Sequence, residues 1–253
     1  MKVIAIIPAR MASSRFPGKP LKPILGLSMI EHVRRRVTLC SMLDDVIVAT
    51  CDKEIADEVE RYGGKATMTS GSHESCVDRV AEAALRFEAK IILNVQGDMP
   101  LILPEVLESL VTPLLQEEDL LCADMMGPVE DEAEFQNINV VKVVQDMSGN
   151  AIYYSREPIP SFNMIASEPK VSRYKQFGIN AFRRSFLITF TNLPRSPLER
   201  IESVDMLRPL EHGYKIRMVS TQYPVVGVDL PGDMEKAEEM MKKDAIYPQY
   251  MDI

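Results

Sequence analysis

Short apolar runs alternate with amphipathic helical patterns through the first half of the chain, and this alternation limits the fold more than any other feature. Runs suited to buried strands lie at residues 2–7, 44–50, 65–69 and 91–96. Patterns suited to helices follow them at residues 29–40, 52–64, 75–87 and 104–116. Strand and helix alternating at such short intervals predict an α/β fold with a parallel sheet and right-handed crossovers.

The second half of the chain has a less regular pattern. Strands are predicted at residues 139–146, 175–184, 215–221 and 225–229, with helices at 196–213 and 231–243. A chain of 253 residues can bury a sizeable core, and no repeat, low-complexity tract or linker divides it. We therefore expect one domain over residues 1–253, in which residues 130–210 form a subregion that covers the substrate.

Charge and composition narrow the classes of partner. The net charge of -8 argues against a nucleic-acid surface, because binding to a phosphate backbone needs a broad basic face. No apolar run approaches the length that spans a bilayer, and no secretory signal is visible. The four cysteines form no CxxC pair, so a disulfide framework or zinc site is not expected and a reducing cytoplasm is the simplest location.

A basic loop, "IPARMASSRFPGKPL" over residues 7–21, follows the first predicted strand of this acidic chain. Ligands of open parallel sheets bind outside the carboxyl ends of the strands. Small residues let the backbone approach a phosphate group, while Arg10, Arg15 and Lys19 can neutralise its charge. The loop is neither a dinucleotide fingerprint nor a P-loop. A phosphate site is therefore predicted, and a solvated basic loop is the alternative.

Two aspartates follow predicted strands and are candidate metal ligands. Asp98 lies in "NVQGDMP" after the strand at 91–96, and Asp229 lies in "VGVDLPGD" before the last helix. Mg²⁺ prefers carboxylate oxygens and usually bridges to substrate phosphates. The alternatives are a turn residue for Asp98 and a helix N-cap for Asp229. Sequence spacing alone does not bring the two residues together.

The histidines and one arginine run suggest structural positions. His32, His73 and His212 lack the spacing of metal ligands, so we expect them at the surface or at helix ends. The run Arg34–Arg36 is expected to form a solvated helix face.

A series of motifs then resembles a known family. The stretches, in chain order, are "IPARMASSRFPGKPL", "DDVIVAT", "NVQGDMPLI", "NVVKVV", "YYSREPIP", "FGINAFRR", "SPLERIE" and "VGVDLPGDMEKA". They occur in the order seen in the CMP-Kdo synthetases, the 3-deoxy-manno-octulosonate cytidylyltransferase family. The resemblance covers about residues 3–242, and the opening loop together with "NVQGD" is highly specific.

The resemblance implies a fold, a reaction and partners. The fold would be a nucleotidyltransferase-type, Rossmann-like, mostly parallel sheet flanked by helices, with a smaller sugar-covering and dimerising subregion. The reaction would join CMP from CTP to a 3-deoxy-2-ulosonic acid and release pyrophosphate. Mg²⁺ would be the cofactor and a homodimer the assembly. No nucleic acid or membrane partner is implied.

The resemblance also implies roles for single residues. The catalytic residues would be Arg10, Lys19 and Asp98. The nucleotide would be bound by Arg10, Ser13, Arg15, Lys19, Arg79 and Gln96. The sugar acid would be bound by Arg15, Gln96, Arg156, Gln176 and Asp205, and Mg²⁺ by Asp98 and Asp229. A forked guanidinium such as that of Arg156 suits a carboxylate better than lysine would.

Several positions depart from the family pattern, and they concern the acceptor more than the phosphates. The usual Ser-Gly-Thr is Ser75-Cys76-Val77, and the usual His-x-Gly-Ile-Tyr begins with Gln176 and ends with Asn180. The usual Glu-Gln-Leu-Arg begins Asp205-Met206, and the usual Glu after Gly-Asp is Met99.

Methionine in place of glutamine removes two hydrogen-bond donors and one hydrogen-bond acceptor. The loss affects which sugar acid the site can bind. The acceptor is therefore expected to be Kdo or a close variant such as 8-amino-Kdo. A related nucleotidyltransferase with another sugar acid or a phosphonate, and an inactive nucleotide-binding homologue, stay open as alternatives.

Overall fold

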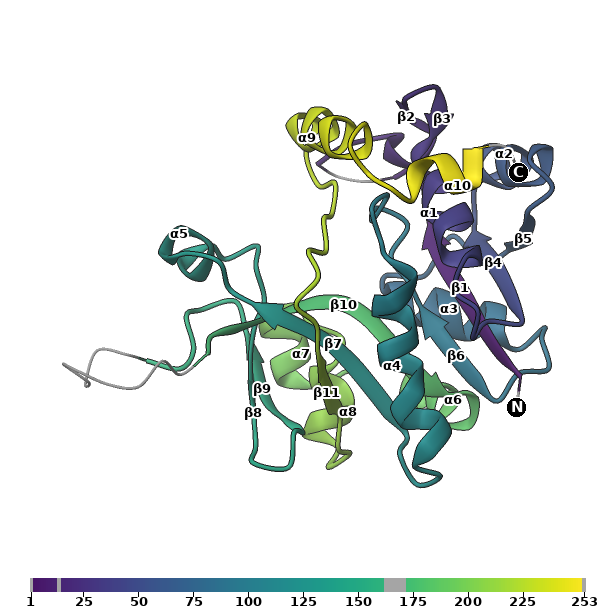
Figure 1. Ribbon diagram of the computed structural model, residues 1–253. Coiled ribbons are helices and arrows are strands. Elements are labelled where there is room, and N and C mark those ends of the chain that lie inside the picture. Colours follow the sequence, from purple (N-terminus) through teal and green to yellow (C-terminus); the bar gives the residue numbers. More distant parts are fainter. Residues whose placement is uncertain (1, 13–14, 162–171, 252–253) are drawn as a thin grey trace.

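A computed structural model describes residues 2–12, 15–161 and 172–251. Its core is a nine-stranded sheet in which seven strands follow the order β11-β7-β10-β6-β1-β4-β5, with β8 and β9 attached beside β10 (Figure 1). The strands are β1 (Val3–Ala9), β4 (Asp45–Thr50), β5 (Lys65–Met68), β6 (Ile91–Asn94), β7 (Cys122–Pro128), β8 (Lys142–Gln145), β9 (Ala151–Ser155), β10 (Tyr174–Arg183) and β11 (Arg217–Ser220). A separate hairpin pairs β2 (Pro23–Ile24) with β3 (Leu27–Ser28).

The sheet has a parallel half and a mixed half. Strands β5, β4, β1 and β6 run parallel to one another. β10 lies antiparallel between β6 and β7, and β11 pairs in parallel with β7. This confirms the predicted α/β fold with a mostly parallel central sheet, and the mixed half adds the antiparallel β10 to it.

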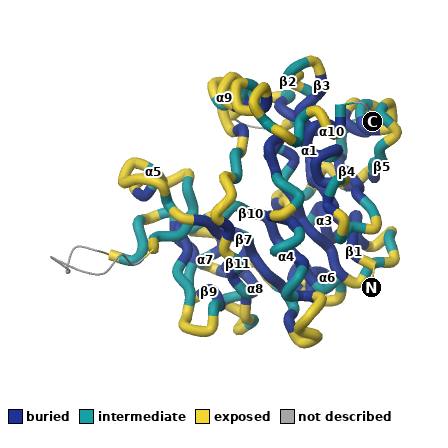
Figure 2. The backbone as a smooth tube through the Cα atoms, in the orientation of Figure 1, coloured by how far each residue is buried: buried dark blue, intermediate teal, exposed yellow. Residues whose placement is uncertain are grey.

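Helices cover both faces of the sheet, so β1 is buried along its whole length. Val3, Ala5 and Ile7 pack into one core, while Ile4 and Ile6 pack into the other. One face carries α1 (Met29–Thr38), α2 (Lys53–Arg61) and α4 (Pro104–Gln116), and the other carries α3 (Cys76–Ala84), α6 (Arg184–Asn192) and α8 (Leu207–Glu211). Figure 2 shows that the strands of the sheet are largely buried between these helices. A strand covered on both faces reads as a continuous apolar run, which is why "VIAII" is visible in the sequence.

The remaining helices lie at the ends of the fold. They are η1 (Lys19–Leu21), α5 (Glu132–Gln136), α7 (Pro197–Glu202), α9 (Pro231–Met241) and α10 (Tyr247–Met251). Among the residues that the structure describes, no helix is long and apolar enough to cross a membrane.

Two predicted elements of the second half are wrong. The single helix expected at residues 196–213 is two helices, α7 and α8, separated at Ser203, whose φ is 54°. The backbone oxygens of Glu202 and Ser203 accept hydrogen bonds from the Arg156 guanidinium. The strand expected at 225–229 is an extended segment outside the sheet, because Val228 donates to the Asp98 backbone oxygen instead.

Several elements were not predicted: the strands β7 and β9, the helix α6, and the shorter η1, β2–β3 hairpin, α5 and α10. The β7 sequence "CADMMGP" is buried over six of its seven residues, but Asp124 and Gly127 interrupt its apolar pattern. A charged residue inside a buried strand breaks the continuous apolar run by which such a strand is recognised in a sequence.

The polar side chains of α1 are also more buried than predicted. His32 is wholly buried, with its Nδ1 2.9 Å from the Tyr250 hydroxyl and its Nε2 2.8 Å from the Ile24 oxygen. Arg35 and Arg36 are buried as well, and Arg36 pairs with Asp244 at 2.5 Å. The C-terminal helix α10 covers this face, so a pattern that looked solvated is an internal polar contact.

The other two histidines meet the expectation in part. His212 is the C-cap of α8, as expected for a helix-end residue. His73 is partly buried and contacts Glu82.

Candidate functional site

The carboxyl ends of β1 and β6 meet at one edge of the sheet, and a cavity opens there. Gly97 turns the chain after β6 so closely against β1 that a Cβ on it would lie 2.9 Å from the Pro8 backbone oxygen. Glycine is therefore required for the turn that carries Asp98. The cavity is lined by the opening loop, by this turn, by the start of α3 and by Asp229.

Lys19 stands at the centre of the polar groups in this cavity, which we call the nucleotide cavity after the role predicted for its residues. Its ammonium lies 2.7 Å from an Asp98 carboxylate oxygen and 3.8 Å from one of Asp229. It also donates to the Val228 backbone oxygen at 2.6 Å. Lys19 is only 8% exposed, and a buried ammonium needs such partners because removal from water disfavours its charge. The fold thus brings Asp98 and Asp229, which are 131 positions apart in the sequence, to one cation.

The other predicted cations lie around the same cavity. Arg15 pairs with Asp229 at 2.9 Å, and both side chains are half exposed. Arg10 is exposed at the end of β1 and lines the cavity. Ser13, predicted to bind the nucleotide, lies outside the described residues.

The N-cap alternative for Asp229 is wrong. Leu230 occupies the N-cap position of α9, and the Asp233 carboxylate accepts from the Leu230 and Asp229 backbone amides. The Asp229 side chain therefore faces the cations rather than the helix.

The start of α3 forms the opposite wall. Ser75 is the N-cap, with its hydroxyl accepting from the Val77 amide at 3.1 Å. The Asp78 carboxylate, three positions further on, lies 3.5 Å from the Arg208 guanidinium. Arg79 is buried and donates to Thr69 Oγ1 at 2.5 Å. Arg79 lines the nucleotide cavity while holding the loop that follows β5.

A second cavity adjoins the first, and Cys76 and Gln96 line both. We call it the acceptor cavity after the role predicted for Gln96, Gln176 and Asp205. Gln96 donates to the Gly178 backbone oxygen at 3.0 Å. Gly178 has a φ of +72° at the irregularity in the pairing of β10 with β7, a conformation that favours glycine. All but one of the positions that depart from the family pattern line this cavity: Cys76, Val77, Gln176, Asn180, Asp205 and Met206. The exception, Met99, is buried in the hydrophobic core.

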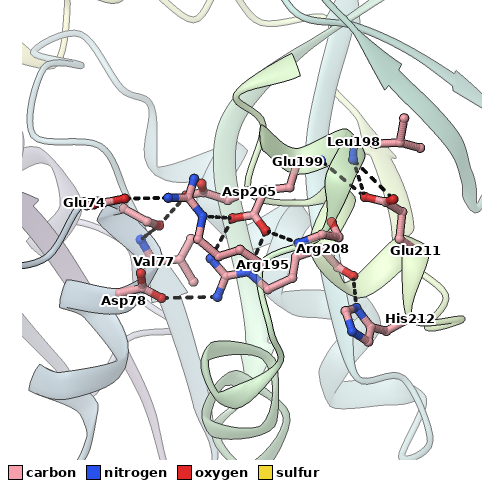
Figure 3. Close-up of polar contacts among 12 residues, drawn as sticks. Glu74, Val77, Asp78, Arg195, Leu198, Glu199, Asp205, Arg208, Glu211 and His212 are labelled. Carbon is pink, nitrogen blue, oxygen red and sulfur yellow. Dashed lines mark hydrogen bonds and ion pairs between the residues drawn. The ribbon is translucent and has the colours of Figure 1, made fainter. Parts of the chain in front are cut away.

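A buried ion-pair network positions Asp205 at the wall between the two cavities (Figure 3). Glu199 accepts two hydrogen bonds from Arg208, at 2.9 and 2.7 Å. Burial alone would raise the pKa of Glu199, but the Arg208 guanidinium holds that pKa below its ordinary value. This pair joins α7 to α8, and in the chain between them Asp205 accepts from the Ser75 hydroxyl at 2.5 Å. Burial raises the pKa of Asp205, while the Ser75 hydrogen bond acts in the opposite direction.

Arg156 lies behind the acceptor cavity rather than in its wall. Its guanidinium donates to the backbone oxygens of Ile138, Glu202 and Ser203. Ser203 lines the acceptor cavity, so Arg156 fixes the corner between α7 and α8 from the outside.

Comparison with known proteins identifies the family. Residues 4–216 match the family model described as Cytidylyltransferase. The chain is 44% identical over 251 residues to the 3-deoxy-manno-octulosonate cytidylyltransferase of Geotalea uraniireducens, with 96% of this chain and 100% of that protein covered. It is 41% identical to the protein of that name in Geobacter metallireducens, with 96% and 99% covered. The chain belongs to the 3-deoxy-manno-octulosonate cytidylyltransferase family. It is therefore a CTP-dependent nucleotidyltransferase, as the motifs predicted.

Solved structures agree with this membership of the 3-deoxy-manno-octulosonate cytidylyltransferase family. A CMP:2-keto-3-deoxy-manno-octonic acid synthetase complexed with CTP superposes with a TM-score of 0.89 at 37% identity, covering 96% of this chain and 99% of that one. A cytidylyltransferase from Leptospira borgpetersenii gives a TM-score of 0.65 at 20% identity, with 96% and 88% covered, which shows a shared fold.

The donor set of the nucleotide cavity fits the Mg²⁺ predicted for this cytidylyltransferase. Mg²⁺ is commonly held by one or two carboxylates together with substrate phosphates and water. Asp98 and Asp229 supply two carboxylates that already converge on one cation, Lys19. No cluster of three or more His, Cys, Asp or Glu ligands occurs within the described ranges, so a cation here would take its other ligands from the substrate.

Two buried polar residues at the acceptor cavity were missed in the sequence: Asn94, which lines the cavity, and Asp124, which lies behind it. Asp124 is wholly buried and accepts from the side-chain amides of Gln176 at 2.7 Å and Asn180 at 2.6 Å. The one available signal was the aspartate inside the apolar run "LLCADMM", because a carboxylate is rarely buried without partners.

Proposed function

We propose that this cytidylyltransferase transfers CMP from CTP to 3-deoxy-manno-octulosonate or a close variant of it, and releases pyrophosphate. The observation that carries the proposal is the convergence of three cations and two carboxylates in the nucleotide cavity, directly beside a second polar cavity. Lys19 is buried between Asp98 and Asp229, and Gln96 borders both cavities. This arrangement suits a triphosphate next to an acceptor. The relatives' names supply the sugar acid.

The reaction needs positioning and charge neutralisation rather than a covalent enzyme intermediate. The anomeric oxygen of the acceptor forms a new bond to the α-phosphorus of CTP. The bond from that phosphorus to the pyrophosphate oxygen breaks, and the hydroxyl proton passes to solvent. Negative charge grows on the pyrophosphate, where Arg10, Arg15 and Lys19 are available to neutralise it.

Asp98 and Asp229 would hold Mg²⁺, which when bound neutralises phosphate charge. Lys19, which is buried, holds both carboxylates in place through its ammonium group. Arg79 and the Ser75 cap shape the wall on the nucleotide side. Gln96, Gln176 and Asp205 offer polar groups to the sugar acid in the acceptor cavity, and Arg156 supports that cavity through Ser203.

We further propose a homodimer in the cytoplasm, with the whole chain acting as one domain whose residues 130–210 cover the acceptor. Symmetric dimers are common among soluble enzymes. The four cysteines are free thiols, which supports a reducing compartment. Sedimentation equilibrium of the purified chain tests the assembly, and a concentration-independent monomer mass would contradict it.

The activity is tested by pyrophosphate release from CTP with a panel of 3-deoxy-ulosonic and sialic-type acids. We expect release that requires CTP, Mg²⁺ and an acid of this class. Binding of CTP without release from any acid would instead support the inactive homologue. Release with another nucleotide or with a phosphonate would identify a related nucleotidyltransferase.

Asp98→Asn tests the carboxylate that Lys19 holds. The substitution keeps the shape of the side chain but removes its charge, so we expect kcat to fall by at least about a hundredfold. The variant should fold with a lower melting temperature, because the buried Lys19 ammonium loses a charged partner. Asp57→Asn on α2, whose partner Lys53 is largely exposed, is the matched control and should retain full activity. Full turnover by the Asp98 variant would remove this residue from the mechanism.

A further inference from the structure

Part of the acceptor cavity beyond its border with the nucleotide cavity is lined by side-chain amides that contact one buried carboxylate. Asn94, Gln176 and Asn180 line the acceptor cavity and do not line the nucleotide cavity. Asp124 on β7 lies behind them, wholly buried. Gln176 and Asn180 project from the neighbouring strand β10, and Asn94 is the last residue of β6.

Asp124 fixes which side-chain amides donate hydrogen bonds and which way their oxygens point. An ionised carboxylate only accepts hydrogen bonds, so each amide that faces it must present its NH₂ group. Gln176 donates to one oxygen of Asp124 at 2.7 Å, and Asn180 donates to the other at 2.6 Å. The carbonyl oxygens of these two amides must then point away from Asp124.

The Asn180 branch extends by one more residue. The Asn180 oxygen accepts from the Asn94 amide at 3.0 Å, which leaves the Asn94 oxygen as the free end of that branch. Asn94 is 0% exposed, and its oxygen has no hydrogen-bond partner among the described residues. A buried acceptor without a donor costs about 1–3 kcal/mol, so a ligand donor in the cavity would remove a real penalty.

We propose that Asp124 is a positioning residue that makes this part of the acceptor cavity a hydrogen-bond acceptor surface, formed by the Gln176 and Asn94 oxygens. The group that it selects is a hydrogen-bond donor on the acceptor sugar, an ammonium or a hydroxyl. This inference rests on the proposed function, because it takes the second cavity as the acceptor site. It adds the chemical polarity that the acceptor must carry there.

The position of this surface indicates which end of the acceptor it meets. The reacting hydroxyl must face the α-phosphorus, and Cys76 and Gln96 mark the border between the two cavities. Asn94 and Gln176 lie beyond that border. The end of the sugar acid remote from its anomeric centre therefore meets the acceptor surface. For an eight-carbon acid this end is C8.

The inference is tested by acceptor binding, separately from turnover. Calorimetry on protein saturated with the α,β-methylene analogue of CTP, which cannot release pyrophosphate, would compare 3-deoxy-manno-octulosonate with its 8-amino and 8-deoxy analogues. We expect 3-deoxy-manno-octulosonate or its 8-amino analogue to bind at least about tenfold more tightly than the 8-deoxy acid. A site built for a hydrogen-bond donor rejects an analogue that lacks it. Whichever acid binds more tightly identifies the donor as hydroxyl or ammonium.

Two variants link this preference to Asp124. In Asp124→Asn the amides are no longer held in one orientation, and in Gln176→Met one of the two oxygens is removed. Each should reduce the preference over the 8-deoxy acid by about fivefold or more and leave the affinity for the CTP analogue within about twofold. The double variant should lose little beyond Asp124→Asn alone, because Asp124 acts through Gln176 as well as through Asn180.

The outcomes separate the two proposals. Binding of the sugar acids without pyrophosphate release from CTP would overturn the proposed function alone. Equal binding of the three acids by the wild-type protein, or an unchanged preference in a folded Asp124→Asn variant, would overturn the acceptor surface. If Asp124→Asn does not fold, an unchanged preference in Gln176→Met would overturn it equally.

Discussion

At the scale of single residues, Asp124 shows how burial and hydrogen bonding compete. Burial raises the pKa of its carboxyl from 3.8 to about 7, although hydrogen bonds from Tyr154, Gln176 and Asn180 act to lower it. In turn, burial and the neighbouring Asp124 charge raise the pKa of Tyr154. The carboxylate is thus retained at a cost to folding, which is typical of groups that serve a site rather than stability.

This cost depends on pH in a predictable direction. Between pH 3.8 and about 7 the folded protein keeps a proton on Asp124 that the unfolded chain has released. The stability contributed by the protonated form is complete below pH 3.8 and is lost as the pH rises through about 7, by up to about 4 kcal/mol. Asp124→Asn has no such group. Its free energy of unfolding should therefore exceed that of the wild type by a margin that grows from pH 5 to pH 8.

Urea denaturation at pH 5, 6, 7 and 8 measures this margin. A margin that is constant over the range would mean that Asp124 titrates alike in the folded and unfolded states.

The affinity for the sugar acid should change in the same pH interval. It should fall below pH 7, because the Asp124 carboxylate gains a proton and no longer fixes both amides. The groups that face it are Cys122 on its own strand, Tyr154 on β9, and Gln176 and Asn180 on β10.

At the scale of elements, the corner between α7 and α8 joins the acceptor cavity to the rest of the fold. Sequence periodicity indicated one helix here, but the chain turns at Ser203 and the two short helices are held by the Glu199–Arg208 pair. Both side chains are almost wholly buried. Removing one partner of a buried pair leaves the other charge without compensation.

Glu199→Ala should therefore lower the free energy of unfolding by about 3–5 kcal/mol. Arg195→Ala is the matched control, because Arg195 contacts the same carboxylate from a position that is 36% exposed. It should cost less than about 1 kcal/mol. Chemical denaturation of both variants checks the difference, and equal losses would contradict a dominant role for the buried pair.

At the scale of the whole molecule, the two ends of the sequence close the site. Lys19 reaches the Val228 oxygen and Arg15 reaches Asp229 across more than 200 residues of chain. Near the C-terminus, Asp244 pairs with Arg36 of α1, and Tyr250 contacts His32, which also contacts the hairpin that follows the opening loop. The last helices, α9 and α10, therefore lie beside α1 and the β2–β3 hairpin (Figure 1).

Asp244→Ala tests this closure. Arg36 is wholly buried, so loss of its partner should destabilise the protein by about 3 kcal/mol. Saturating CTP should restore about 2.7 kcal/mol at a hundred times its Kd, since it binds the folded state. Lys242→Ala, which removes an exposed pair on α9, should change stability by less than about 1 kcal/mol. Thermal unfolding with and without CTP measures both effects, and a loss at Asp244 no larger than that at Lys242 would contradict the argument.

The sequence by itself determined the parallel half of the sheet, the helices that cover it and the opening basic loop at the end of its first strand. These features depend on local periodicity and on residues that follow a strand directly, and both are visible along the chain. Only the tertiary structure decided that Asp98 and Asp229 share Lys19, that Arg36 and His32 are buried, and that Asp124 orients the amides of the acceptor cavity. Each of these depends on contacts between residues distant in sequence, and such contacts leave no periodic signal in a single chain.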